Sequence, residues 1–335
     1  MLLREMIEIY SPTGSTDILV DFLIGWAGRR GFHAHKDEVG NFIAEKGEGK
    51  TILLVGHLDT VAGEIPIRVE GKRLYGRGVV DAKGALACFL EAAHAVKRGR
   101  IVVVGTIDEE GDSKGAQNIL NKYNPNFIVI GEPSGWSNLN IGYKGRINLL
   151  YTNEKSKEHT SSPNPNCIEE AMAFFNGMRK FCDSFNEGKT LFEQLGMKLL
   201  SINSEEDGFT QKTKMAMNFR IPPHFDIEKM RSHAEKCKCN ASLHYSHYEE
   251  PVRVGKDNKL VKAFMKAIRL NGGKVSFKLK SGTSDMNILQ KYNVPMMTYG
   301  PGDSTLDHTS FEHLDVDEYE KAVEVLKMVL EEILG

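Results

Sequence analysis

Acidic and histidine side chains follow the apolar segments of this 335-residue sequence at the points where those segments end. The segment at 51–56 leads into His57, the segment at 101–107 leads into three acids, and the segment at 127–131 leads into Glu132. The complete set is His57, Asp59, Asp81, Asp108, Glu109, Glu110 and Glu132. Because sites in open α/β sheets form beyond the carboxyl ends of the strands, we expect these side chains to share one cleft.

Each residue of this set has an ordinary structural explanation when it is taken alone. Asp81 could cap the helix that follows it, and His57 could be a buried histidine bonded to Asp59. Together, however, six acids around one histidine would repel one another strongly unless cations neutralised them. A pair of divalent metal ions is therefore the most economical interpretation.

The spacing of the residues supports a metal site. His57 and Asp59 are two residues apart, so on an extended segment they share one face, and the Asp59 carboxylate could fix the histidine tautomer. Glu109 and Glu110 are adjacent and point differently, so one could bind a metal while the other acts as general base. Such ligands suit Zn²⁺, with Co²⁺ or Mn²⁺ as substitutes, and zinc lowers the pKa of its bound water to about 7.

Other kinds of site fit the sequence less well. A phosphate-binding loop fails because Ala44 stands where its first glycine belongs, and Gly76 and Gly78 lack the third glycine of a dinucleotide-binding motif. The sequence has no G-x-S-x-G elbow for a serine nucleophile. Cys237 and Cys239 have no second Cys/His pair at zinc-finger spacing, so we interpret them as thiols.

The composition limits the partners and the compartment. The 43 basic and 45 acidic residues leave a net charge of −2, which gives no overall basic field for nucleic acid or an anionic membrane. No apolar run approaches the length of about 18 residues that a membrane span needs. The first residues carry charges within their apolar stretch and do not resemble a secretory signal. Five scattered cysteines favour a reducing cytoplasm, so we expect a cytoplasmic protein.

The elements that must position the acids alternate between helix and strand. Helical spacing of apolar residues predicts helices at 17–30 and 83–98. The Val- and Ile-rich runs at 51–56, 101–107 and 127–131 predict strands that are buried on both faces. Helices interleaved with such strands indicate an α/β fold, with a mainly parallel sheet and helices on both faces.

The middle of the sequence has a different pattern. It predicts strand, helix, strand, strand, helix and strand in that order, the β-α-β-β-α-β arrangement of a small α+β domain. The α/β pattern then resumes, and the sequence closes with an amphipathic helix at 317–334. We therefore predict one domain formed by residues 1–146 and 254–335, with a second domain inserted at 147–253.

The sequence resembles the dinuclear-zinc amidohydrolase and exopeptidase family in four motifs. They are GHLDTV (56–61), YGRGVVDAKGAL (75–86), GTIDEEGDSKGA (105–116) and GEPSGW (131–136), and they occur in the family's order. The family includes acetylornithine deacetylase, succinyl-diaminopimelate desuccinylase and the glutamate-releasing carboxypeptidase. The resemblance covers nearly the whole chain, and it implies a catalytic α/β domain with an inserted lid domain that usually dimerises.

The resemblance implies two zinc or cobalt ions in each subunit. His57 and Glu132 correspond to ligands of one ion, and Asp81 to the carboxylate that bridges both. Glu110 corresponds to a ligand of the second ion. The last ligand in the family is a histidine that follows a Gly-rich loop and precedes an acid, which fits His308.

The resemblance also assigns the catalytic groups. Glu109 corresponds to the general base, and Asp59 to the acid that orients His57. His313, the other histidine near the C-terminus, is interpreted as structural. His159 matches the lid histidine that reaches a neighbouring subunit's active site as an oxyanion donor, although larger residues surround it here and a surface histidine is the alternative.

Two further segments resemble substrate-binding parts of the family. MNFRIP corresponds to the strand that supplies Asn218 and Arg220, whose alternative is an ordinary charged sheet face. SGTSDMNIL corresponds to a loop beside the metals. There Gly282, Thr283 and Ser284 could donate to substrate or cap the following helix.

Within the family, the sequence is most similar to a compact branch that frees lysine or ornithine from an amino-group carrier protein in lysine and arginine biosynthesis. This similarity implies amide hydrolysis, a homodimer through the lid, and a small acidic carrier protein as partner. A basic rim would attract such a carrier. Its candidates are Lys144, Arg146, Arg220, Lys278 and Lys280.

Several alternatives remain open at this point. The substrate could be N-acetylornithine, N-acetyl-lysine or succinyl-diaminopimelate, or the site could serve a dipeptidase or an aminopeptidase. A metal-binding protein without catalysis is a different class of function, and the presence of both Glu109 and Glu110 argues against it.

Overall fold

The computed structural model describes residues 1–335 and divides into two compact units. Unit 1 consists of residues 1–142, 253–279 and 284–335, and unit 2 consists of residues 143–252 and 280–283. Unit 2 therefore interrupts unit 1 in the sequence. Each unit has its own hydrophobic core.

Unit 1 is built around a nine-stranded sheet with the order β1-β2-β6-β3-β7-β15-β8-β13, in which β14 pairs with β8. The strands are β1 (His33–Lys36), β2 (Phe42–Lys46), β3 (Thr51–His57), β6 (Arg100–Thr106), β7 (Phe127–Gly131), β8 (Asn138–Tyr143), β13 (Val252–Arg253), β14 (Ser276–Lys280) and β15 (Met296–Thr298). The central strands β6, β3, β7 and β15 are parallel, whereas β1, β2 and β8 pair antiparallel.

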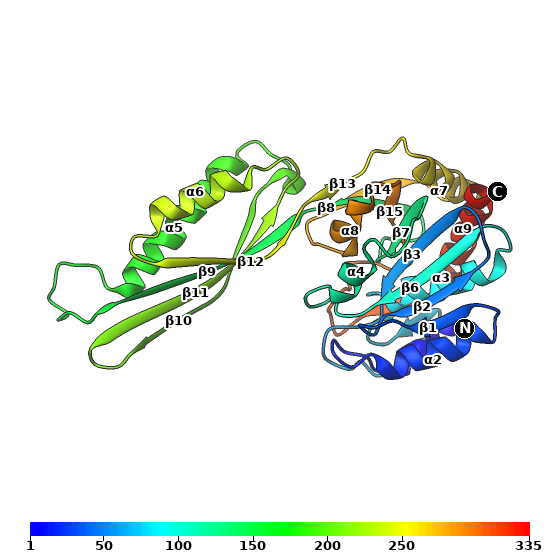
Figure 1. Ribbon diagram of the computed structural model, residues 1–335, viewed down its shortest axis with the longest axis horizontal. Coiled ribbons are helices and arrows are strands. Elements are labelled where there is room, and N and C mark those ends of the chain that lie inside the picture. Colours follow the sequence, from blue (N-terminus) through cyan, green and yellow to red (C-terminus); the bar gives the residue numbers. More distant parts are fainter. The chain divides into compact units, whose positions relative to one another are not determined.

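Helices cover both faces of this sheet (Figure 1). They are α1 (Leu2–Ile7), α2 (Asp17–Gly28), α3 (Lys83–Ala95), α4 (Lys114–Ile119), α7 (Lys259–Leu270), α8 (Asp285–Leu289) and α9 (Val316–Leu334), with a 3₁₀ helix at Gln290–Tyr292. On β3, Ile52 and Leu54 join the main core with residues of α3 and α9, and Leu53 and Val55 are equally buried on the opposite face. This two-sided burial confirms the predicted α/β architecture with a mainly parallel sheet.

A small three-stranded sheet, in the order β16-β5-β4, joins two distant parts of unit 1. Its strands are β4 (Arg68–Glu70), β5 (Arg73–Tyr75) and β16 (His313–Asp315). β16 pairs antiparallel with β5, so His313 lies opposite Tyr75. The segment that follows His308 is thereby fixed beside the segment that precedes Asp81.

Unit 2 is a four-stranded antiparallel sheet, in the order β10-β11-β9-β12, with two helices on one face (Figure 1). Its elements are β9 (Gly145–Ser156), α5 (Cys167–Asn186), a 3₁₀ helix (Leu191–Glu193), β10 (Gly196–Glu206), β11 (Thr210–Ile221), α6 (Ile227–Cys237) and β12 (Ser242–Glu249). Its core packs Phe174 of α5 and Met230 of α6 against Tyr151 and Phe219 of the strands. The order of these elements is the predicted β-α-β-β-α-β arrangement.

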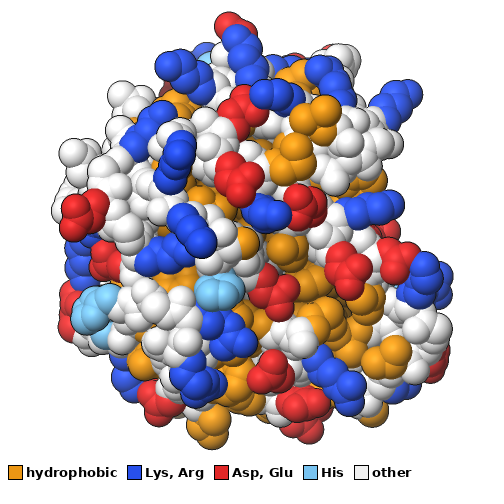
Figure 2. Space-filling model, turned by 90° about the vertical axis from the view of Figure 1, so that its right-hand side faces the viewer, with side chains coloured by type: hydrophobic (Ala, Val, Ile, Leu, Met, Phe, Trp, Pro, Cys, Tyr) orange, Lys and Arg blue, Asp and Glu red, His pale blue; other side chains and the backbone are white.

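The molecular surface agrees with the near-zero net charge. On the face shown in Figure 2, basic and acidic side chains are interspersed, and no large area of a single sign is visible there. No helix in the structure combines the length and the apolar character that a membrane span requires.

Candidate metal centre

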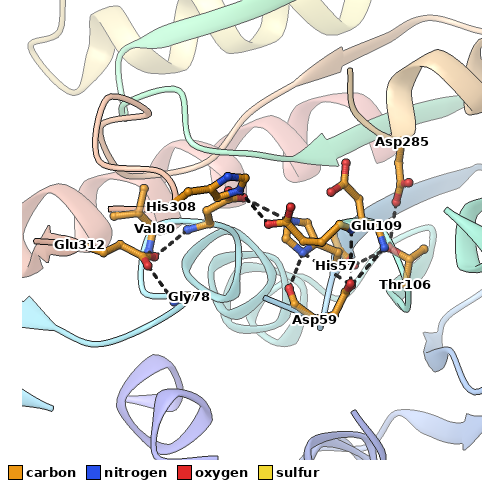
Figure 3. Close-up of polar contacts among 12 residues, drawn as sticks. His57, Asp59, Gly78, Val80, Thr106, Glu109, Asp285, His308 and Glu312 are labelled. Carbon is orange, nitrogen blue, oxygen red and sulfur yellow. Dashed lines mark hydrogen bonds and ion pairs between the residues drawn. The ribbon is translucent and has the colours of Figure 1, made fainter. Parts of the chain in front are cut away.

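The loops at the carboxyl ends of the parallel strands carry most of the predicted metal ligands. β3 ends at His57, β6 leads into Glu109, and β7 leads into Glu132. Asp81 comes from the loop before α3. His308 comes from the loop before β16 (Figure 3). The structure therefore brings residues from distant parts of unit 1 together beyond the carboxyl ends of its parallel strands, as the sequence pattern predicted.

The Asp81 carboxylate lies between two groups of potential metal ligands. Its Oδ1 atom is 3.2 Å from His57 Nε2, and its Oδ2 atom is 3.1 Å from His308 Nε2. His308 Nε2 also lies 3.0 Å from Glu110 Oε1. Within each group the ligand atoms are within 4.8 Å of one another; the groups are His57, Asp81, Glu132 and Asp81, Glu110, His308. One carboxylate with an oxygen in each group is the arrangement of a bridging ligand.

The charges of this cluster fit a pair of bound cations. Hydrogen bonds to the Asp81 and Glu110 carboxylates raise the pKa of His308 to about 10. Burial opposes the protonation of His57, but Asp81 and the nearby acids outweigh it and raise its pKa well above the usual range. Burial and neighbouring acids raise the pKa of Glu132 as well. Metal ions bind neutral imidazole and ionised carboxylate, so they would replace these protons, and this donor set suits Zn²⁺ or Co²⁺.

Glu109 belongs to neither group of metal ligands. It lies in the same cluster, where burial raises the pKa of its carboxyl group well above the usual range, and the nearby charges of Asp285 and Glu110 act in the same direction. A carboxylate of raised basicity that lies outside both ligand groups has the properties that a general base needs.

Asp59 contacts His57 through a different atom from the one predicted. The Asp59 main-chain oxygen is 2.7 Å from His57 Nδ1, whereas its carboxylate Oδ1 is 3.9 Å away. The carboxylate instead accepts hydrogen bonds from the main-chain N–H groups of Glu109, at 3.2 Å, and Glu110, at 3.3 Å, and from the Thr13 hydroxyl at 2.8 Å. Asp59 therefore positions the loop that carries Glu109 and Glu110, and it also positions the imidazole ring of His57.

Asp285, for which the sequence pattern predicted no role, is buried beside this cluster. Its Oδ2 accepts a hydrogen bond of 2.8 Å from the Thr106 hydroxyl at the end of β6 (Figure 3). This bond ties the start of α8 to the strand that leads into Glu109. Its position in SGTSDMNIL, immediately after Gly282, Thr283 and Ser284, is the sequence feature that indicates a place beside the site.

His159 and the two residues predicted on the lid strand lie in unit 2. His159 is exposed in the loop after β9, and its Nδ1 lies 2.8 Å from the Ser161 hydroxyl. Arg220 Nη1 donates to Thr283 Oγ1 at 3.2 Å. The structure thus brings together two of the residues predicted to bind substrate, from segments far apart in the sequence.

The other residues predicted to bind substrate make ordinary structural contacts. Asn218 Nδ2 donates to Asn148 Oδ1 at 2.7 Å, across the sheet of unit 2. Ser284 caps α8, because its hydroxyl accepts the main-chain N–H of Met286 at 3.2 Å. Gly282 lies in the loop just before this cap. Capping was the alternative that the sequence had left open for Ser284.

The proposed basic rim needs a correction. Lys144 is buried, and its ammonium group donates to the Gln194 main-chain oxygen at 2.7 Å. It is therefore not available to a protein partner, and that part of the prediction is wrong. Arg146 forms an ion pair of 2.7 Å with Glu249, which neutralises its charge locally.

Comparisons with known proteins identify a matching family, similar sequences and a similar fold. Residues 53–332 match the model of peptidase family M20/M25/M40. A LysW-lysine hydrolase of Deinococcus radiodurans is 38% identical, with 100% of this chain and 96% of that protein covered. A LysW-lysine/LysW-ornithine hydrolase of Sulfurisphaera tokodaii is 31% identical, with 99% and 94% covered. The crystal structure of an M20 family metallo-carboxypeptidase from Sulfolobus solfataricus has the same fold, with a TM-score of 0.80, 16% identity and 98% of each chain covered.

Proposed function

Because the chain belongs to the M20/M25/M40 peptidase family, whose members are metal-dependent hydrolases, we propose that it releases lysine or ornithine from a LysW-type amino-group carrier protein. The observation that carries the catalytic part is the Asp81 carboxylate, which presents one oxygen to each of two ligand groups. The full-length similarity to the two named hydrolases supports the substrate. The bond to be cleaved is the amide that links the carrier's terminal glutamate to the α-amino nitrogen of the amino acid.

Two zinc or cobalt ions, held by the two ligand groups around Asp81, would lower the pKa of a bound water and polarise the amide carbonyl. Glu109 accepts the proton of the attacking water and returns it to the nitrogen of the leaving amino acid. In a dimer, His159 of the partner subunit donates a hydrogen bond to the carbonyl oxygen as negative charge develops there. Arg220 and Thr283 bind a substrate carboxylate, since a guanidinium group offers a paired set of donors.

We also propose that the protein is a homodimer that pairs through unit 2. The strand β10 lies at the edge of its sheet, and most of its side chains are exposed on both faces. Leu200 is 60% exposed on this strand, and Phe209, in the turn between β10 and β11, is 84% exposed. An edge strand that bears exposed apolar side chains is suited to pairing with a second copy. Light scattering should report a dimer, and a fully active monomer would contradict this proposal.

We also propose a cytoplasmic location for the protein, on the evidence of its cysteines. All five cysteines are free thiols, which suits a reducing compartment. Lysine and arginine biosynthesis would then be the setting in which a carrier-linked substrate is available.

A parallel assay of several substrates tests the proposed function. The purified enzyme with Zn²⁺ or Co²⁺ is given carrier-linked lysine, carrier-linked ornithine, N-acetylornithine, N-succinyl-diaminopimelate and an unblocked dipeptide, and free amino acid is measured. We expect the carrier-linked substrates to be cleaved at least tenfold faster than the others, with the advantage decreasing as salt screens the acidic carrier. Preference for the acetylated or succinylated compound, or for the dipeptide, would overturn the carrier assignment while leaving the amide hydrolase.

A further inference from the structure

A buried carboxylate near the C-terminus organises the loop that carries Asp81. Glu312 is 0% exposed, and its two oxygens accept four hydrogen bonds from that loop. Figure 3 shows Glu312 beside Gly78 and Val80 of the loop. Oε1 accepts the main-chain N–H groups of Val80, at 2.9 Å, and Asp81, at 3.1 Å. Oε2 accepts the N–H of Gly78, at 3.1 Å, and Nη1 of Arg77, at 3.0 Å. Three of the four donors are main-chain N–H groups and the fourth is the Arg77 guanidinium, so the contact holds the loop itself and touches no metal-binding side chain.

The position of Glu312 in the chain gives this contact its significance. Glu312 lies four residues after His308, and it immediately precedes β16, which pairs with β5. Residues 77–81 begin two positions after the end of β5 at Tyr75. One side chain therefore joins the two segments that supply Asp81 and His308, which face each other at 3.1 Å.

The backbone conformations of His308 and Gly78 explain why the segments that contain them need a stabilising contact. His308 has a φ of +61°, in the left-handed region that non-glycine residues seldom adopt, and Gly78 has a φ of +81°. At Gly78 a Cβ atom would lie 2.7 Å from Thr60 Cγ2, so the loop also passes close to its neighbours. Conformations of this kind persist when the surrounding contacts determine them, and Glu312 supplies four such contacts.

We propose that Glu312 is a positioning residue of the metal centre, which holds the bridging carboxylate of Asp81 and the imidazole of His308 in register. This inference rests on the metal centre of the proposed function, and it does not depend on the substrate. Four donors require the acceptor capacity of an ionised carboxylate, whereas a glutamine would offer one oxygen and turn an amide N–H₂ toward two donors. Outer groups that orient metal ligands typically contribute a factor of about 10–100 to metal affinity.

The test measures metal affinity directly, by titrating the metal-free protein with Zn²⁺ against a chromogenic chelator. We expect Glu312→Gln to weaken at least one of the two binding events by about 10–100-fold. Glu312→Asp keeps the negative charge with a shorter reach and should retain part of the affinity. Circular dichroism of the metal-free variants establishes that they are folded, and if Glu312→Gln does not fold, the titration of Glu312→Asp decides.

The matched control is Glu91→Gln on α3. The Glu91 carboxylate also accepts a main-chain N–H, from Leu2 at 2.9 Å, and a hydroxyl, from Tyr319 at 3.0 Å, but neither partner carries a metal ligand. We expect Glu91→Gln to lose thermal stability and to bind both ions with unchanged affinity. Unchanged zinc affinity in Glu312→Gln, or in a folded Glu312→Asp when Glu312→Gln does not fold, would overturn the inference and leave the proposed function intact. A wild-type protein that takes up no metal would overturn both.

Discussion

The main-chain oxygen of Asp59 lies 2.7 Å from Nδ1 of His57, so the ring is oriented by backbone rather than by a carboxylate. The Asp59 side chain is thereby available to accept the N–H groups of Glu109 and Glu110. A single residue connects three components of the centre: a ligand from each metal group and the expected base. Its backbone serves one of them and its side chain serves the other two.

Because the backbone and the carboxylate of Asp59 contact different groups, the effect of Asp59→Asn can be predicted. The substitution leaves the main-chain contact to His57 in place but removes one acceptor oxygen from the Glu109–Glu110 loop. We expect turnover to fall about 10–100-fold, with the larger loss of metal affinity at the group that contains Glu110. Activity assays combined with a zinc titration measure both effects. Thr13→Val removes only one donor to Asp59 and should have a much smaller effect.

The position of Glu109 outside both ligand groups predicts that metal binding and catalysis can be separated. Glu109→Gln should bind two ions and lose about 10²–10⁴-fold in turnover, since the amide cannot accept the proton of the attacking water. Metal analysis and the rate of amino-acid release are the measurements. Glu110→Gln is the matched control, and it should lose metal. Near-normal turnover in Glu109→Gln would contradict its role as base.

Removal of the metals should have effects on activity and on stability. A chelator is expected to abolish hydrolysis, and added Zn²⁺ or Co²⁺ should restore it. The ions bind the folded state, so at a free concentration 100 times the dissociation constant each stabilises it by about 2.7 kcal/mol. Thermal unfolding with and without chelator measures this difference. A metal-free protein with full activity would contradict the dinuclear assignment.

The cysteines differ in exposure, which predicts their reactivity. Cys239 is exposed, whereas burial raises the pKa of the Cys88 thiol well above its usual range and that of Cys182 to about 12. Since the thiolate is the reactive form, we expect a chromogenic disulfide reagent to modify Cys239 first in the native protein. Cys239→Ser should remove that fast phase, and denaturant should expose all five thiols. A fast reaction that survives in Cys239→Ser would contradict this assignment.

The first turn of α5 predicts a stability effect confined to unit 2. The Asn166 side chain accepts the N–H groups of Ile168 and Glu169, and the Glu169 carboxylate accepts the Asn166 N–H in return. Asn166→Ala should destabilise this unit by about 0.5–2 kcal/mol, measured by denaturant unfolding. Asn166→Asp keeps the cap and serves as the control. Zinc affinity should be the same in both variants.

The architecture could be predicted where strands are buried on both faces. The runs that became β3, β6 and β7 are short, apolar and rich in Val and Ile, and such runs indicate a covered parallel sheet. The edge strand β1 gave no comparable signal, because three of the four side chains in His33–Lys36 are polar and exposed. The three-stranded sheet was also missed, since its pairing joins segments that are far apart in the sequence.

The residue types of the candidate site could be predicted from the sequence, but the hydrogen bonds that join its segments could not. His57, Asp81 and Glu132 stand at strand ends or before a helix, where sequence position alone is informative. The bonds of Glu312 to residues 77–81 span more than two hundred positions, and no local pattern indicates them. The burial of Lys144 could not be predicted either, because a single lysine in a sequence gives no sign that its ammonium group will be buried.

The interruption of unit 1 by unit 2 determines when the enzyme can become active during its synthesis. A chain that leaves the ribosome from its N-terminus has completed nearly all of unit 2 before residues 253–335 exist. The helix α9, which packs against α3 and α7, emerges after both of them. His308 and Glu312 appear just before α9, so the nascent protein carries an incomplete set of the proposed ligands until these residues have been made. A nascent chain that has not reached His308 is therefore expected to be unable to attack amide bonds, and hydrolytic activity should begin only after this segment has been added.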